Sequence, residues 1–177
     1  MRLSVAAAVC CLLPGLAIAH GPSRLKVTGS IEINAPADKV WARISKFDDV
    51  SWLGPVAKTE GAGGSAIGAT RRVTLKGDGS PTVDEELVKY DATAMSLTYK
   101  ITKVDPKVLP VTNYSSTLSV SAVDAGKSKV EWRAGFYRGY PNNDPPPELN
   151  DDASMAAVTK LYQTGLQDLK KTVESGR

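Results

Sequence analysis

The sequence has very little of the chemistry on which many hydrolases and metalloproteins depend. Its 177 residues include one histidine, His20, and two cysteines, Cys10 and Cys11. Because all three lie within the first twenty residues, the rest of the chain has neither residue type. Thiol catalysis, Ser-His-Asp triads and zinc sites of cysteine and histidine are therefore excluded there. We expect no metal site, no cofactor and no catalytic residue.

An excess of charge of one sign is also lacking. The chain carries 22 lysines and arginines against 19 aspartates and glutamates. Arg71-Arg72 and Lys170-Lys171 are isolated basic pairs, and the other basic residues are scattered. Nucleic-acid binding, which needs a concentrated basic surface, is therefore not expected.

The one long apolar run lies at the N-terminus and has the layout of a secretory signal peptide. Arg2 precedes an apolar stretch from Val5 to Ile18, which ends among small residues. The run is too short to span a bilayer, and its layout predicts cleavage before His20. We expect residues 1–19 to be a signal peptide. Residues 20–177 would then form one exported domain, with no membrane anchor and no disulfide.

Alternation of apolar and polar residues predicts a series of strands in the middle of the chain. In the first strand, Val27, Ile31 and Ile33 fall on one face. Turn sequences such as Gly77-Asp78-Gly79 and Asp124-Ala125-Gly126 separate later strands. The expected strands cover residues 26–34, 56–60, 69–76, 83–90, 96–104, 113–123 and 129–137.

Helical spacing is found on both sides of this run of strands. Val40, Trp41 and Ile44 predict a short helix after the first strand, and a second short helix is expected around Trp52. Apolar residues recur at three- and four-residue steps over 155–173, which predicts a long C-terminal helix. The fold class is α+β, with a curved antiparallel sheet wrapped around that helix. Such an arrangement tends to leave a cavity between the two layers.

Several short motifs carry a resemblance to a known superfamily. Ile31-Glu32-Ile33-Asn34-Ala35-Pro36 is followed by Val40-Trp41, and Gly68-Ala69-Thr70-Arg71 follows a glycine-rich loop. These segments resemble the START and polyketide-cyclase-like (SRPBCC) helix-grip proteins, and the resemblance extends from Lys26 to Val173. It implies a START-like, helix-grip fold for nearly all of the exported chain.

Further motifs are similar to the MxaD-type periplasmic proteins. They are His20-Gly21-Pro22 after the signal peptide, then Ser51-Trp52, then the Ala-Lys-Thr-Glu-Gly segment at 57–61. The MxaD family accompanies methanol dehydrogenase and is thought to promote electron transfer to a cytochrome c without being a catalyst. The resemblance thus implies a periplasmic, non-enzymatic accessory protein whose partners are methanol dehydrogenase and cytochrome c.

Any electrostatic steering of such partners would be local, because the chain is nearly neutral. Lys58, Arg71 and Arg72 are the candidate partner-binding residues. A solvated strand charge is the expected role of the carboxylates at 84–86, among which Glu86 differs in phase from its neighbours.

Two other functions stay open. A carrier would hold a hydrophobic small molecule or lipid in the cavity. A cyclase-like enzyme would need an acid or base there, and the lack of an internal histidine disfavours it. The candidate cavity or rim residues, for which packing in the core is the alternative, are Trp52, Glu86, Tyr99, Tyr114, Trp132 and Phe136.

Overall fold

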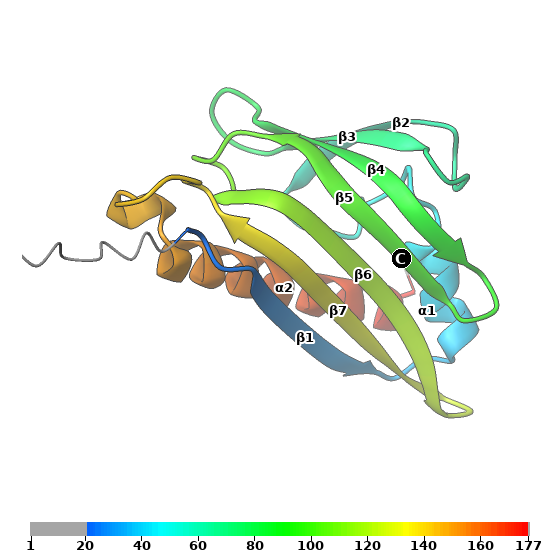
Figure 1. The fold of residues 1–177 in the computed structure, drawn as a ribbon. Helices are drawn as coiled ribbons and strands as arrows, with labels where there is room; N and C mark the ends of the chain where they lie inside the picture. The colour runs from blue at the N-terminus through cyan, green and yellow to red at the C-terminus, as the bar shows by residue number, and fades with distance from the viewer. Residues whose placement is uncertain (1–20, 177) are drawn as a thin grey trace, which may run out of the picture.

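The fold is one antiparallel sheet whose inner face is crossed by a long helix (Figure 1). A computed structural model describes residues 21–176, so the expected signal peptide, both cysteines and His20 lie outside the described residues. The strands are β1 (Leu25–Ile33), β2 (Val56–Ala62), β3 (Thr70–Leu75), β4 (Thr82–Asp91), β5 (Ser96–Val104), β6 (Val111–Asp124) and β7 (Lys127–Arg138). Each expected strand is present with ends within two residues of the prediction.

The strand order β1-β7-β6-β5-β4-β3-β2 places the first two strands at opposite edges of the sheet. Each strand from β2 to β7 pairs with its neighbour in sequence, whereas β1 pairs with β7. The connection from β1 to β2 must therefore pass from one edge to the other. It closes one end of the molecule with helix α1 (Ala37–Ile44) and a run of turns.

The short helix α1 follows from its sequence, but the second short helix is not formed. Pro36 precedes α1, and Val40, Trp41 and Ile44 on its apolar face are buried. Around Trp52 the chain instead makes successive turns. The carboxylate of Asp49 accepts bonds from the backbone N–H and the hydroxyl of Ser51, at 2.9 and 2.7 Å, which stabilises a turn in place of a helical one.

The long helix α2 (Asp151–Glu174) begins where the capping residues predict. The side chain of Asn150 accepts a bond of 2.8 Å from the backbone N–H of Ala153, and Asp151 and Asp152 occupy the first turn. A short 3-10 helix, η1 (Pro147–Leu149), leads into it. These features confirm the expected α+β fold, with a curved sheet and a long C-terminal helix.

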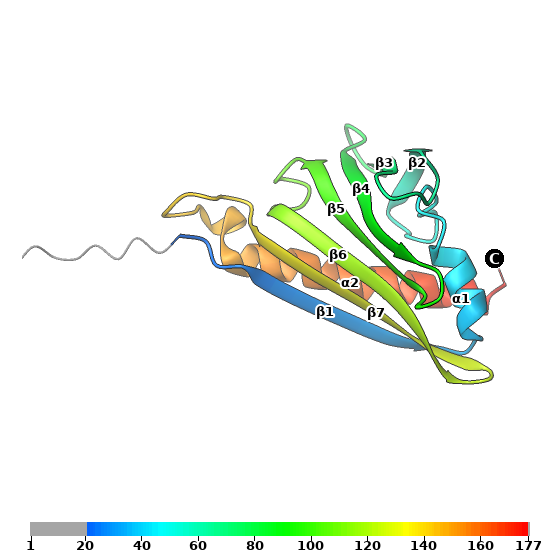
Figure 2. The same cartoon turned by 45° about the vertical axis from the view of Figure 1, so that its right-hand side comes forward.

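One half of the sheet packs directly on α2 and the other half stands away from it. Within the sheet, α2 packs mainly on β1 and β7, while β2 to β5 diverge from the helix, as Figure 2 shows. At Gly29 in β1, a Cβ atom would lie 3.1 Å from Leu166 and 3.3 Å from Tyr162, so a side chain there would require these two residues to shift. The close approach at β1 and the divergence at β2 to β5 leave space on one side only.

A bulge in β6 changes which residues face that space. Thr112 pairs with Tyr137 and Ser115 with Gly135, so β6 has one extra residue, and Asn113 adopts a φ of 48°. As a result, Tyr114 faces the interior, as Val111 does three residues earlier. Among residues 21–176, no helix combines the length and apolar character needed to cross a membrane.

Candidate functional site

The space between α2 and the diverging strands is a cavity of about 400 Å³. Its walls come from β3 to β7, from the turns before β2, from the link between β5 and β6 and from one face of α2. Most of the lining is apolar, with aliphatic side chains such as Val73, Leu97, Ile101, Leu118 and Leu161. A volume of this size is typical of sites that enclose a small organic molecule.

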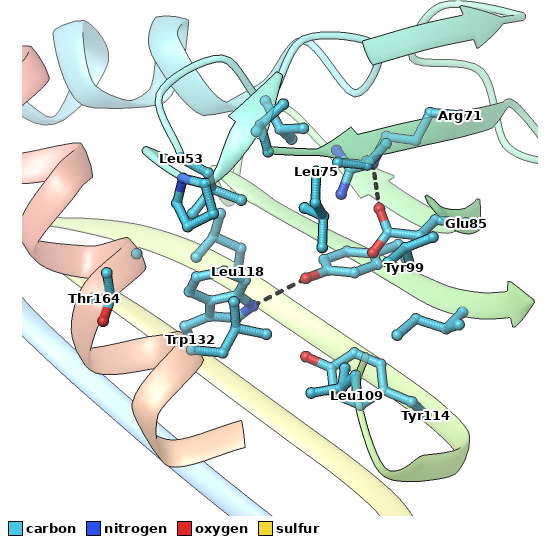
Figure 3. Close-up of a pocket in the computed structure, with 18 of the residues that line it drawn as sticks. Leu53, Arg71, Leu75, Glu85, Tyr99, Leu109, Tyr114, Leu118, Trp132 and Thr164 are labelled. Atoms are coloured by element: carbon cyan, nitrogen blue, oxygen red, sulfur yellow. Dashed lines mark hydrogen bonds and ion pairs between the residues drawn. The ribbon is translucent and has the colours of Figure 1, made fainter. Parts of the chain in front are cut away.

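One wall of the cavity holds a buried ion pair. Arg71 of β3 and Glu85 of β4 are 8% and 7% exposed, and the Nε of Arg71 donates to an oxygen of Glu85 at 2.5 Å (Figure 3). The two residues are directly opposite each other in the ladder. Because the charges cancel, this wall offers polar atoms without a net charge.

The guanidinium of Arg71 is fixed on three further sides. Its Nη1 donates to the carbonyl oxygen of Phe47 at 2.8 Å. The guanidinium carbon lies 4.2 Å from the ring centre of Phe47 and 4.9 Å from that of Tyr99. The planar guanidinium of Arg71 stacks favourably against aromatic rings, so the Arg71–Glu85 ion pair also holds the ring of Tyr99 in place.

A chain of hydroxyl groups runs beneath the cavity. The indole Nε1 of Trp132 donates to Ser116 at 2.8 Å and, over a longer 3.2 Å, to Tyr99. Ser116 in turn contacts the hydroxyl of Tyr162 at 2.7 Å, and Tyr162 contacts Tyr114 at 2.8 Å. These bonds join β5, β6, β7 and α2 at one point, so the polar floor of the cavity is rigid.

Burial keeps these phenols neutral. It raises the pKa of Tyr99 well above the ordinary 10.0, with smaller contributions from Tyr114 and Glu85. Burial, followed by the neighbouring Tyr162, does the same to the pKa of Tyr114. The pKa of Tyr162 is also raised, chiefly by burial. Each hydroxyl is therefore a hydrogen-bond donor near neutral pH and a poor proton acceptor.

Two tryptophans close the side of the cavity nearest α2. Trp132 stacks on Tyr162 with ring centres 4.3 Å apart, and Trp52 lies against Trp132 at 5.8 Å. Gly165 of α2 makes room for Trp132 and Leu53, because a Cβ atom there would lie 2.8 Å from Trp132 and 2.7 Å from Leu53. The indole N–H of Trp52 is buried and has no acceptor within the described part of the chain.

The mouth of the cavity lies beside α2. Lys160 and Thr164 of α2 line the cavity and are exposed to solvent. Across from them, the turn at Gly54 is held from both sides: its N–H donates to Asp168 at 2.8 Å, and its carbonyl accepts from Lys76 at 2.6 Å. The rim is thus fixed to the helix on one side and to the sheet on the other.

Four of the six candidate ligand residues line the cavity: Trp52, Tyr99, Tyr114 and Trp132. Phe136 is fully buried behind Tyr114, with ring centres 6.0 Å apart, and does not line the cavity. Glu86 lies on the outer face of β4, where it pairs with Lys100 at 3.0 Å. The carboxylate in the cavity is its neighbour Glu85, which is buried instead of solvated as the sequence had led us to expect.

The alternation of β4 could have indicated Glu85. Val83, Glu85 and Leu87 occupy every second position, and all three face inward. A carboxylate between two apolar residues of the same phase is the pattern of a buried charge with a partner. Ser116 and Tyr162 were also missed as parts of the polar floor, because no local pattern links β6 to α2.

The candidate partner-binding residues divide between two environments. Arg71 is buried in the cavity wall, so it is not available to a protein partner. Lys58 and Arg72 are exposed, but each is paired with a carboxylate: Lys58 with Glu60 at 2.8 Å and Arg72 with Asp84 at 2.6 Å. Local neutralisation weakens any steering by these two residues.

A curved sheet that grips a long helix around an apolar cavity defines a helix-grip protein. The chain matches the family described as polyketide cyclase / dehydrase and lipid transport over residues 24–174. It belongs to that family, which supports the SRPBCC-type resemblance seen in its sequence. No curated protein matches the sequence.

Solved structures share this fold with different degrees of sequence identity. An uncharacterised protein from Bacillus thuringiensis is 25% identical, with a TM-score of 0.71 over 85% of this chain and 99% of its own. The ZhuI aromatase/cyclase from a Streptomyces species is 18% identical, with a TM-score of 0.69 over 86% and 94%. Norcoclaurine synthase from Thalictrum flavum, solved with dopamine and hydroxybenzaldehyde, is 15% identical, with a TM-score of 0.67 over 97% and 99%.

The site can enclose an apolar molecule and offer it a few fixed polar contacts. Its ionisable groups away from the mouth are the neutralised Arg71–Glu85 pair and tyrosines that burial keeps protonated. Across residues 21–176, no cluster of histidine, cysteine, aspartate and glutamate is arranged to hold a metal ion.

Proposed function

We propose that this protein is an exported, non-enzymatic binding protein for a small hydrophobic molecule. The observation that carries the proposal is the cavity of about 400 Å³, which is apolar on most sides and open beside α2. Burial of an apolar ligand there is favourable by roughly 25 cal/mol per Å² of apolar surface removed from water. Membership of a family that includes lipid transport in its description agrees with this role.

The polar groups of the cavity favour binding over catalysis. General acid–base catalysis needs a group that can give or take a proton near the working pH. Burial raises the pKa of Tyr99 and Tyr114 well above that range, and Glu85 is occupied by Arg71. These side chains can orient a ligand without reacting with it.

The test measures cavity occupancy directly. The neutral fluorophore N-phenyl-1-naphthylamine should bind and gain fluorescence, and native mass spectrometry should detect a co-purifying ligand. Leu75→Trp, which fills part of the cavity from β3, should weaken binding of the fluorophore at least tenfold, which corresponds to a loss of about 1.4 kcal/mol of binding free energy. Thr74→Trp is the matched control, because Leu75 lines the cavity whereas Thr74 does not.

Absence of fluorophore binding by the folded wild-type protein would contradict the proposal. Equal binding by the two tryptophan variants would show that the fluorophore binds elsewhere on the surface.

The binding protein is further proposed to act alongside methanol dehydrogenase and a cytochrome c in the periplasm. Its support is the sequence resemblance to MxaD-type proteins at Ser51-Trp52 and 57–61. These segments lie in the rim of the cavity and in the edge strand β2. Adding the protein to purified dehydrogenase should raise the rate of methanol-dependent cytochrome c reduction, and an unchanged rate at all salt concentrations would exclude this role.

A further inference from the structure

The hydroxyl of Tyr99 differs from the other hydroxyls of the cavity, because its proton has no acceptor in the part of the chain that the structure describes. Five N–H and O–H groups meet at the polar floor, on Tyr99, Tyr114, Ser116, Trp132 and Tyr162. Ser116 donates its one hydroxyl proton to the carbonyl oxygen of Arg133 at 3.0 Å, so Tyr162 must be the donor to Ser116. Because the Tyr162 proton is then used, Tyr114 is the donor to Tyr162. The Trp132 N–H is shared between Ser116 and Tyr99.

Tyr99 therefore accepts a bond but donates none. Ser116 is close enough to Tyr99 for its hydroxyl to lower the Tyr99 pKa, which burial raises, but both lone pairs of Ser116 already receive protons, one from Trp132 and one from Tyr162. No hydrogen bond from Tyr99 to any other side chain or carbonyl is formed in the described chain. A buried donor without an acceptor is unfavourable, so an acceptor atom on a ligand in the cavity would stabilise the Tyr99 hydroxyl.

The position of Tyr99 gives this donor a fixed direction. The ring lies against the guanidinium of Arg71, and its hydroxyl points toward Trp132 at the middle of the cavity (Figure 3). Tyr99 is 4% exposed and lies on β5, which is hydrogen-bonded to β4 on one side and to β6 on the other. A donor fixed in this way needs no rearrangement to meet a ligand.

The adjacent ion pair decides which charge the acceptor carries. A carboxylate ligand near Tyr99 would be repelled by Glu85, and a cationic ligand would be repelled by Arg71. Neither charge of the pair is available to a ligand, because Arg71 and Glu85 neutralise each other. An extra charge in this wall would have no partner. A neutral oxygen, such as that of a ketone, satisfies the Tyr99 proton without that penalty.

We propose that Tyr99 determines the specificity of the cavity by donating a hydrogen bond to a neutral acceptor oxygen, such as a ketone carbonyl, on an otherwise apolar ligand. This inference rests on the proposed binding function and adds the ligand's chemistry to it. The surrounding leucine, valine and isoleucine side chains accommodate the apolar body, while Arg71 positions the ring of Tyr99.

The experiment compares two ligands of nearly the same shape. 2-Acetylnaphthalene carries a ketone where 2-ethylnaphthalene has a methylene group. Each is used to displace N-phenyl-1-naphthylamine from the full-length exported protein, and the ratio of their dissociation constants is measured in wild type and in Tyr99→Phe. We expect the ketone preference to fall about tenfold in Tyr99→Phe, as loss of one hydrogen bond implies.

Tyr114→Phe is the matched variant. It removes a hydroxyl from the same part of the cavity, but one whose proton is already donated to Tyr162. Any change in affinity should apply to both naphthalenes alike, so the ratio should stay at the wild-type value. A ratio that falls equally in both tyrosine variants would overturn the assignment to Tyr99.

A spectroscopic measurement does not depend on any variant. The carbonyl stretch of 2-acetylnaphthalene should move to lower frequency on binding to the wild-type protein, and this shift should disappear in Tyr99→Phe. An unshifted band in the wild-type complex would overturn the inference. So would 2-naphthoate binding as tightly as the ketone.

The outcomes separate the two proposals. If N-phenyl-1-naphthylamine and both naphthalenes fail to bind, the binding function itself is wrong. If they bind with the same ketone preference in wild type and Tyr99→Phe, the cavity binds apolar molecules but Tyr99 does not select among them.

Discussion

Two arginine–carboxylate pairs lie next to each other on β3 and β4 and face opposite sides of the sheet. Arg71 pairs with Glu85 on the inner face, and Arg72 pairs with Asp84 on the outer face. The inner side chains are 7% and 9% exposed, whereas the outer ones are 56% and 21% exposed. Both pairs join the same two strands, so the main difference between them is the environment.

The comparison shows how the same chemistry acquires two roles. On the outer face, the hydrogen bond and charge of Arg72 hold the pKa of Asp84 below its usual value, but solvent and salt screen the interaction. On the inner face the two charges depend on each other, because water is largely excluded. The inner pair therefore shapes one wall of the cavity, while the outer pair is a surface contact.

Removal of the inner carboxylate should have the largest effect. We expect Glu85→Ala to lower the free energy of unfolding by about 3–5 kcal/mol, because it leaves the charge of Arg71 buried without a partner. The matched Asp84→Ala should cause a far smaller loss, since Arg72 remains solvated. Urea denaturation of the two variants measures the difference.

The double variant Arg71→Met/Glu85→Leu provides a control for the first prediction. It removes both charges and should restore the free energy of unfolding to within about 1 kcal/mol of wild type. Equal losses in Glu85→Ala and Asp84→Ala would mean that water reaches the inner pair as freely as the outer one.

Alkaline pH should affect the inner face through its tyrosines. Tyr99, Tyr114 and Tyr162 have a raised pKa when folded, so above pH 10 the unfolded chain loses their protons while the folded protein keeps them. Their contribution is fully present below that pH and decreases above it. Between about pH 10 and about pH 11 we expect each to remove about 1 kcal/mol from the free energy of unfolding.

Denaturation in urea at both pH values, together with phenolate absorbance, tests this expectation. Part of the phenolate signal should appear only when the protein unfolds. Tyr99→Phe should reduce the alkaline loss of stability by about a third, as expected for one of three similar groups. A variant with the full loss would show that Tyr99 ionises in the folded protein.

The last prediction compares the packed half of the inner face with the half that borders the cavity. Leu166→Ala, where α2 meets β1, should cost about 3 kcal/mol, because the packed interior cannot fill the space. Leu75→Ala on the cavity wall should cost about 1 kcal/mol, since its side chain is only half-buried and borders the cavity. Thermal and urea unfolding of both variants measures these losses. Similar losses in Leu166→Ala and Leu75→Ala would contradict the prediction.

Local sequence was sufficient for the strands, the first short helix and the long helix, and four of the five aromatic candidates line the cavity. Alternation placed every strand to within two residues, and the Asn150 cap located the start of α2. It was not sufficient around Trp52, where hydrogen bonds from Ser51 to Asp49 stabilise turns instead of the expected helix. Helix and turn share the same residue types there, and only neighbouring contacts decide between them.

The choice among the charged residues needed the assembled sheet. Glu86 was a candidate cavity residue and Arg71 a candidate partner-binding residue, but Glu86 lies on the outer face and Arg71 is buried. Glu85, expected to be solvated, is buried beside Arg71. In sequence, Arg71 and Arg72 are equivalent neighbours. Which of them is buried depends on the phase of β3 against a face that curves over α2.

The sequence by itself determined the order of the strands and helices, the apolar face of α2 and the absence of histidine and cysteine after the first twenty residues. These follow from periodicity and composition, which are local properties of the chain. Only the tertiary structure decided that α2 packs on β1 and β7 and leaves a cavity against β2 to β5. It also decided that the Tyr99 proton has no acceptor among residues 21–176, because hydrogen-bond partners from β6, β7 and α2 meet only when the sheet closes on the helix.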